Sequence, residues 1–280
     1  SSVVVVEDLD NDGIPESRRD ILVSASGLNH GLEVADTYLY ASRSTDVYRW
    51  PYDPTTKTVS SSVAETVITN INADGMGGAP FGHTTRTLVI DGDNSTLYVS
   101  VGSNENIDAD SFRSRIRYFD ITNSSLFPLD FVEGEVFVDG LRNEVGMELD
   151  SNNTLWGVGN SADRLFRSDL GGDIHNDNPA EEMHKLLLGQ NYGYPFCWRE
   201  YELLGQGMGR GTAWAWPTTM DNVTDDMCRK DYDAPEFVLP AHSAPLGLTF
   251  YQFPETPCEG VKRFPKQMDG WAFIAYHGSW

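Results

Sequence analysis

The sequence predicts an all-β fold of the β-propeller type, because one strand pattern recurs at a constant spacing along the chain. A short run of aromatic, leucine and small residues appears at 38–41, 97–100 and 155–158. The leucines of these runs are separated by two equal steps of 58 residues, and after two further steps the pattern resumes at 271–275. Short strands at regular spacing, with few helical stretches, are typical of propellers, in which each repeat is one blade.

A second strand pattern precedes each of these runs and completes the repeat. The preceding segments are 30–34, 87–90, 146–149 and 247–251. A further repeat is expected near Ala213, where an irregular insertion obscures the pattern. At a spacing of 58 residues, a chain of 280 residues holds about five blades.

Polar side chains recur at one position of the repeat, directly before its first strand. They are Asn29 and His30, His83, Arg142 and Asn143, and His242. Equivalent positions of successive blades lie around one mouth of the central channel of a propeller. We therefore expect these residues to form a functional site at that mouth, although they are far apart in the sequence.

The composition excludes several classes of function. The formal net charge of −22 argues against binding to nucleic acid or to an anionic membrane surface. No run of about 18 apolar residues exists, so no membrane-spanning helix is predicted. Hydrophobic residues make up 40% of the chain, which is enough for a sizeable core. An anionic ligand would be repelled at long range, so its site must supply local cations.

Glycosylation and cysteine patterns favour a secreted protein, although the first residues lack the basic start and cleavage site of a signal peptide. Sequons begin at Asn94, Asn123, Asn152 and Asn222. Cys197 and Cys228 flank the irregular insertion and could close it as a disulfide. Cys258 is then left over, either free or paired outside this sequence. The chain is either cytosolic or already processed, and we expect a secreted protein.

An acidic motif near the start has two interpretations. Asp8, Asp10, Asp12 and Gly13 form D-x-D-x-D-G, the first half of a calcium loop. An EF-hand would have glutamate at the twelfth position, where this chain has Arg19. A turn between two strands and a calcium site both remain open.

Four motifs in the middle of the chain carry a family resemblance. They are G-L-R-N-E-V-G at 140–146, G-N-S-A-D at 159–163, E-E-M-H at 181–184 and N-Y-G-Y-P at 191–195. Together they resemble the soluble quinoprotein glucose/sorbosone dehydrogenases, which bind pyrroloquinoline quinone (PQQ), and most closely the fungal PQQ-dependent pyranose dehydrogenases. In that family the second motif begins with glutamate, where this chain has Gly159, and the third motif is D-E-I-N.

The resemblance implies a six-bladed β-propeller in a longer domain, of which this chain holds about five blades as a single domain over 1–280. The residues His277-Gly278-Ser279-Trp280 match a family segment that continues into further sheet. We therefore expect the chain to lack the C-terminal end of that domain, and part of its beginning as well.

The resemblance also implies roles for individual residues. His83 matches the histidine that takes the proton from a substrate hydroxyl. Arg142 and Asn143 would bind cofactor oxygens, and the backbone carbonyls of Ser161 and Ala162 would hold a calcium ion. The further cofactor-binding candidates are Asn29, His30, His242 and His277, and His242 and Trp280 are also candidates for the substrate side.

These implications predict a secreted, PQQ- and calcium-dependent dehydrogenase that oxidises a hydroxyl of a pyranose or related sugar. Its electrons would pass to a heme domain or another acceptor. Two other functions share the fold, namely a calcium-dependent propeller lactonase and a propeller that binds a protein partner without catalysis. A lactonase would need carboxylates and amides that converge on calcium, and a binding module would tolerate loss of His83. The combination of Arg142, Asn143 and His83 favours the dehydrogenase.

Overall fold

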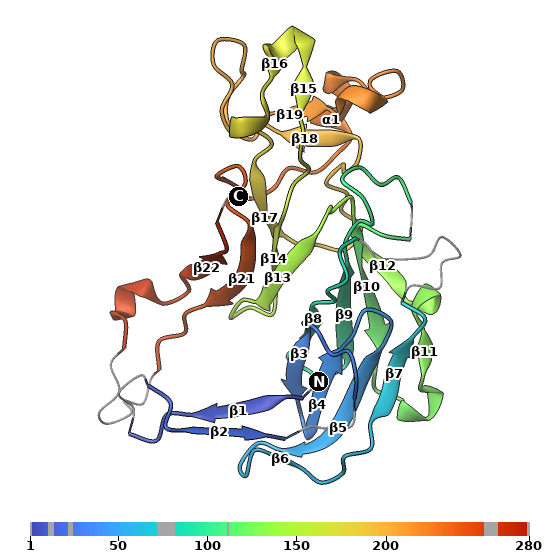
Figure 1. Ribbon diagram of the computed structural model, residues 1–280, viewed down its shortest axis with the longest axis vertical. Coiled ribbons are helices and arrows are strands. Elements are labelled where there is room, and N and C mark those ends of the chain that lie inside the picture. The colour runs from blue at the N-terminus through green and yellow to red at the C-terminus, as the bar shows by residue number, and fades with distance from the viewer. Residues whose placement is uncertain are drawn as a thin grey trace.

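The computed structural model describes residues 2–10, 14–21, 25–71, 82–110, 112–254 and 263–278. Within these ranges the protein is an array of β-sheets with one short α-helix (Figure 1). Asp12, Gly13, Cys258 and Trp280, which the sequence analysis names, lie outside the described residues.

Three sheets form the main body, and each contains a row of four strands in which neighbours pair antiparallel. The first sheet contains β3 (Leu32–Ala35), β4 (Tyr38–Ser42), β5 (Val47–Asp53) and β7 (Glu65–Thr69). The second contains β8 (Leu88–Ile90), β9 (Thr96–Val101), β10 (Arg115–Asp120) and β12 (Glu135–Asp139). The third contains β13 (Glu144–Leu149), β14 (Leu155–Gly159), β17 (Glu181–Lys185) and β20 (Phe237–Leu239).

The other strands form hairpins or extend the first sheet. The hairpins are β1 (Val4–Glu7) with β2 (Ser17–Asp20), β15 (Phe166–Arg167) with β16 (Gly172–Asp173), β18 (Cys197–Arg199) with β19 (Ala213–Ala215), and β21 (Pro245–Phe250) with β22 (Ala272–Tyr276). β6 (Thr58–Val59) pairs with β5, and β11 (Leu129–Asp130) runs parallel to β7.

The helices of the described residues are short. The α-helix is α1 (Asp225–Lys230). The 3₁₀ helices are η1 (Ser124–Leu126), η2 (Phe131–Glu133), η3 (Ser168–Leu170), η4 (His175–Asp177), η5 (Pro217–Thr219) and η6 (Lys266–Met268). None of the helices in this part of the chain is long and apolar enough to cross a membrane.

The predicted repeat is confirmed for four strand pairs. β3 with β4, β8 with β9, β13 with β14, and β21 with β22 are antiparallel neighbours, and the repeating leucines Leu39, Leu97 and Leu155 are buried. The first strands also contact one another in series, β3 with β8, β8 with β13, and β13 with β21. The repeats are therefore arranged side by side about their first strands, as in a propeller.

The blade count expected from the sequence is not confirmed. The blade-like units of the described residues are three rows of four strands, the first of them extended by β6 and β11, and the β21–β22 pair. The strand near Ala213 is β19, which pairs with β18 and not with a blade. The insertion between β17 and β20 breaks the 58-residue spacing. A constant period therefore cannot be extended across this part of the chain.

The core lies between neighbouring sheets. In β9, Leu97 and Val99 pack toward the first sheet, against residues such as Val47 and Ile68, whereas Tyr98 packs on the opposite side with Met147 and its neighbours. This alternation follows from the two-residue period of a strand. Burial of each such side chain contributes about 1.5–3 kcal/mol, so the contacts between sheets fix their relative positions.

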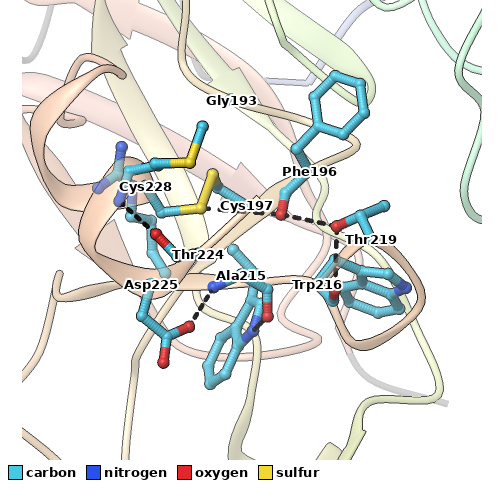
Figure 2. The surroundings of a disulfide bond; sticks show 12 residues. Gly193, Phe196, Cys197, Ala215, Trp216, Thr219, Thr224, Asp225 and Cys228 are labelled. Atoms are coloured by element: carbon cyan, nitrogen blue, oxygen red, sulfur yellow. Dashed lines mark hydrogen bonds between the residues drawn. A yellow bond between two sulfur atoms is a disulfide. The ribbon is translucent and has the colours of Figure 1, made fainter. Parts of the chain in front are cut away.

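The insertion has a core of its own and contains the predicted disulfide. Cys197 and Cys228 are bonded, and their Cα atoms lie 5.7 Å apart, which confirms the pairing expected from the sequence (Figure 2). Around the bond, Asp225 accepts the Ala215 backbone N–H at 2.7 Å (Figure 2). Trp198, Trp214 and Trp216 pack with Ala162 and Leu165, so the insertion supports the loop that follows β14.

Candidate functional site

The predicted site segments lie at one end of the first strands. Residues 29–30 precede β3, 82–87 precede β8, 140–143 precede β13, and 240–244 precede β21. Two further loops meet them, 102–106 after β9 and 160–163 after β14. Most of the hydrogen bonds described below run between these segments, so the gathering expected from the repeat is found.

His83 is held as a neutral base. Its Nδ1 lies 2.9 Å from the Ser103 carbonyl oxygen and 3.1 Å from the Ser103 hydroxyl oxygen. The carbonyl can only accept, and the Ser103 hydroxyl donates its proton to the Glu105 carbonyl at 2.7 Å, so Nδ1 carries the ring proton. Burial and the Arg142 guanidinium lower the pKa of His83 to about 4. At neutral pH the ring therefore presents Nε2 as a proton acceptor.

Asn143 approaches His83 across Gly102. A Cβ atom at Gly102 would lie 2.4 Å from Asn143 Oδ1 and 2.7 Å from His83 Cβ, so only glycine allows this approach. The buried Asn143 side chain donates to Asn160 Oδ1 at 3.4 Å, and Asn160 donates to the Pro245 carbonyl at 2.9 Å. These amides connect the second, third and fourth repeats at the site.

Arg142 is held by long hydrogen bonds to two neighbouring loops. Its guanidinium donates to the Asn106 carbonyl at 3.3 Å, to Asn106 Oδ1 at 3.2 Å and to Asp163 Oδ2 at 3.4 Å. The Asn106 side chain also bonds the backbone of Asp163, accepting from its N–H at 2.7 Å and donating to its carbonyl at 2.6 Å. Asn106 thus positions both the cation and the carboxylate beside it.

The loop after β14 offers backbone oxygens. The Ser161 N–H donates to Glu181 Oε2 at 2.6 Å, and the Ser161 hydroxyl donates to the Ala180 carbonyl at 2.5 Å. Within the described ranges, no hydrogen bond reaches the carbonyl oxygens of Ser161 or Ala162. Two carbonyls that accept no described hydrogen bond suit a hard cation such as calcium.

His242 joins this group through Asp163. Its Nδ1 lies 3.6 Å from Asp163 Oδ1, and its Nε2 lies 2.6 Å from the His175 carbonyl oxygen. The His242 backbone has a φ of 56°, in the left-handed region that non-glycine residues rarely occupy. His242 is therefore brought to the same end of the strands as Arg142.

The remaining predicted residues lie at the edges of this group. Asn29 is exposed and donates to the Thr84 carbonyl at 3.1 Å, and His30 is exposed with Nε2 3.2 Å from the Val145 carbonyl. The backbone N–H of the exposed His277 donates to the Ala244 carbonyl at 2.9 Å. No described side-chain contact joins these three residues to His83 or Arg142, and their cofactor roles stay predictions.

The family profile described as TrAA12-like matches residues 2–280. The chain belongs to this family. It is 34% identical to a pyrroloquinoline quinone-dependent sugar dehydrogenase of Hypocrea jecorina (strain QM6a), over 92% of this chain and 60% of the relative. The chain therefore spans about three fifths of the length of that curated relative.

Two solved structures are similar to this TrAA12-like chain. The holo form of the pyranose dehydrogenase PQQ domain from Coprinopsis cinerea matches with a TM-score of 0.82 and 29% identity, over 98% of this chain and 66% of that one. The calcium structure of the Trichoderma reesei family AA12 enzyme matches with a TM-score of 0.76 and 32% identity, over 88% and 64%. The resemblance found in the sequence motifs is thereby confirmed.

Two departures of this TrAA12-like chain from the motifs are explained by one buried contact. Glu144 on β13 reaches across β14 to His184 on β17, where Oε1 lies 2.9 Å from Nδ1, and Glu182 Oε2 lies 2.9 Å from Nε2. The residues of β14 that lie between them are Gly157 and Gly159. A Cβ atom at either position would lie 2.1 Å or 2.2 Å from a Glu144 oxygen, so both glycines leave room for the Glu144 side chain to reach His184.

In this row His184 lies between two carboxylates inside the sheet. Burial opposes a charge on His184, but the Glu144 and Glu182 carboxylates outweigh it and raise the pKa of His184 to about 9. A small cavity of about 30 Å³ lies beside the row and is lined by both Glu144 and Arg142. The row of Glu144, His184 and Glu182 therefore lies next to the candidate site.

Sequence reasoning missed Asn106, Ser103 and the role of His175. A signal for the first two was present, because 102–106 follows β9 as 160–163 follows β14, and both loops contain serine and asparagine next to a glycine. His175 lies in η4, and only the fold brings it to His242.

The acidic motif at the start remains ambiguous. Oxygens of Asp8, Asp10 and Glu16 lie within 4.8 Å of one another, and Asp12 lies outside the described residues. Exposed acidic groups commonly gather in this way around a turn, so the two interpretations of the motif stay open.

Proposed function

We propose that this protein is a PQQ- and calcium-dependent dehydrogenase that oxidises a hydroxyl group of a pyranose or a related sugar. The observation that supports the proposal is that the neutral base His83 lies at the same end of the first strands as the Arg142 guanidinium and the carbonyl-rich loop 160–163. The relatives support this reaction class, since the Hypocrea jecorina protein is a PQQ-dependent sugar dehydrogenase.

The hydrogen-bond donors at this end of the strands fit an anionic cofactor with several carboxylates and carbonyls. Arg142 supplies a fixed cation, and its hydrogen bonds are 3.2 Å or longer, so the guanidinium can turn toward a ligand with little loss. Asn143 is joined to Asn160 by one 3.4 Å bond and can add an amide contact. Asn29, His30, His242 and His277 are the further proposed contacts.

Calcium would be held by the carbonyl oxygens of Ser161 and Ala162. These atoms accept no described hydrogen bond, and the loop is fixed from behind by Glu181 and by the tryptophans of the insertion. Calcium binds a variable number of oxygen ligands, including backbone carbonyls. Other ligands would therefore complete its coordination.

The chemistry divides between the chain and the cofactor. PQQ supplies the two-electron acceptor when it is bound, and a calcium ion next to it would polarise that acceptor. His83 Nε2 takes the proton of the substrate hydroxyl, and the Ser103 carbonyl holds the ring in the tautomer that this step requires. Burial and, to a lesser extent, the charge of Arg142 keep the ring neutral beforehand, because both disfavour a second positive charge there.

The proposal extends to the whole protein. We propose that the sheets belong to a six-bladed propeller, that the protein is secreted and glycosylated, and that its electrons pass to a heme domain or another acceptor. The disulfide of the insertion supports secretion, since such bonds persist in oxidising compartments.

Two substitutions test this assignment because one should affect turnover and the other cofactor binding. His83→Gln should leave the PQQ affinity nearly unchanged and lower kcat by about 10²–10⁴, because only the base is lost. Arg142→Gln should weaken PQQ binding, because the fixed cation is lost. The measurements are a PQQ titration by absorbance and sugar-dependent bleaching of the bound cofactor. Full turnover in His83→Gln would remove the base assignment.

A further inference from the structure

Three metal-binding side chains converge at the edge of the site from distant parts of the chain. Asp163 follows β14, His175 lies in η4 of the segment between β14 and β17, and His242 precedes β21. One donor atom of each lies within 4.8 Å of the other two. Two imidazoles and one carboxylate at this spacing are typical of a transition-metal site rather than of a calcium site.

His242 is oriented to give Nδ1 to this group. Its Nε2 donates to the His175 carbonyl at 2.6 Å, which leaves Nδ1 on the side of Asp163 Oδ1, 3.6 Å away. Metal-binding histidines commonly donate their second N–H to a backbone carbonyl in this way.

Asp163 is held in place independently of the two histidines. Asn106 bonds its backbone N–H and its carbonyl, at 2.7 Å and 2.6 Å. Arg142 contacts Oδ2 at 3.4 Å, whereas Oδ1 faces His242. The backbone of His242 is in the left-handed region, with a φ of 56°, which fixes the direction of its side chain.

His175 completes the group and sets its chemistry. Its ring packs against His242 with centroids 4.5 Å apart, and its Nδ1 accepts the Arg164 backbone N–H at 3.0 Å. The neutral ring therefore carries its proton on Nε2. Binding of a metal to this ring displaces either that proton or the Arg164 hydrogen bond, so metal binding is expected to release protons.

We propose that Asp163, His175 and His242 form a binding site for a divalent transition-metal ion of the zinc class, separate from the calcium proposed at Ser161 and Ala162. His242 then binds this ion through Nδ1 instead of contacting the cofactor. Zinc takes imidazole and carboxylate ligands in tetrahedral geometry, and water would fill the fourth position. The ion ties the η4 segment to the loops after β14 and before β21. The site does not depend on PQQ.

The test is a calorimetric titration of the chelator-treated protein with zinc chloride, in the presence of excess calcium. One zinc ion should bind per chain, and calcium should not displace it, because nitrogen donors favour zinc. Asp163→Asn and His242→Ala should each weaken zinc binding at least about tenfold. The matched control His277→Ala removes an exposed histidine and should leave zinc binding unchanged.

Several results would overturn the proposal. They are an absence of saturable zinc binding, displacement of zinc by calcium, and equal losses in His277→Ala and His242→Ala. Thermal unfolding of the unsubstituted protein gives a readout that needs no variant. Zinc should raise its Tm in proportion to the logarithm of zinc concentration, and an unchanged or lowered Tm would count against the site.

Discussion

At the scale of single residues, His83 illustrates how neighbouring groups determine the protonation state and tautomer of a side chain. A histidine normally titrates near neutrality, but burial and the charge of Arg142 lower the pKa of His83 to about 4. The Ser103 carbonyl then selects the tautomer with the proton on Nδ1. The sequence identifies the residue by motif, but both effects come from groups outside the motif.

The lowered pKa of His83 predicts a dependence of stability on pH. The unfolded chain binds a proton at this residue below about pH 6.5, whereas the folded protein does so only below about pH 4. Stability should therefore fall as the pH falls from about 6.5 to about 4. His83→Gln should remove part of this loss, as measured by urea unfolding at several pH values. His277→Gln is the control, and an equal change in both variants would contradict the account.

At the scale of elements, β14 shows that two departures from the family motifs lie at one buried contact. Gly157 and Gly159 leave space for the Glu144 side chain to cross the strand and reach His184. The departure from the family motif at Gly159 is thus matched by the departure at His184. Neither could be explained from the sequence, because the contact spans three strands whose register is known only in the fold.

This packing predicts a coupling between Gly157 and Glu144. Gly157→Ala places a methyl group 2.1 Å from Glu144 Oε1 and should destabilise the protein by about 1–3 kcal/mol. In the Glu144→Ala background the same change should have a much smaller effect. Denaturant unfolding of the four variants measures the coupling free energy. Gly247→Ala, where the added Cβ would meet only Ala275 at 3.4 Å, is the control. Additive effects at 157 and 144 would contradict the packing.

The strands that recur at 58 residues could be predicted, whereas the insertion could not. Leu39, Leu97 and Leu155 mark strands with both faces buried, and such strands have a strong pattern. In the insertion, β18 and β19 have three residues each, and their stability depends on the disulfide and on packed tryptophans. Short strands of that kind leave no period to detect, and the predicted blade count is not confirmed there.

At the scale of the whole molecule, the charge opposes the proposed cofactor. The net charge of −22 repels an anion at distances where solvent and salt determine the interaction, whereas Arg142 acts only at contact. The position of the site could be predicted from the repeat. The contacts of Asp163 with Asn106 and His242 could not, since they join loops of three different repeats.

This opposition predicts an unusual salt dependence for PQQ association. Salt screens the long-range repulsion, so the association rate should rise between about 10 mM and about 150 mM ionic strength. Stopped-flow absorbance at fixed calcium concentration measures this rate, and an uncharged viscosity agent is the control. A rate that falls with salt would mean that local cations dominate the approach of the cofactor.

The central claim is that Arg142 and the loop 160–163 bind PQQ together with a calcium ion. A titration tests this claim most directly. The protein is titrated with PQQ, first with calcium and then with an excess of a calcium chelator, and the binding is followed by absorbance. The account predicts saturable binding with calcium, loss of that binding on chelation, and bleaching of the bound cofactor when sugar is added. Absence of binding with calcium present, or binding that the chelator leaves unchanged, would contradict it.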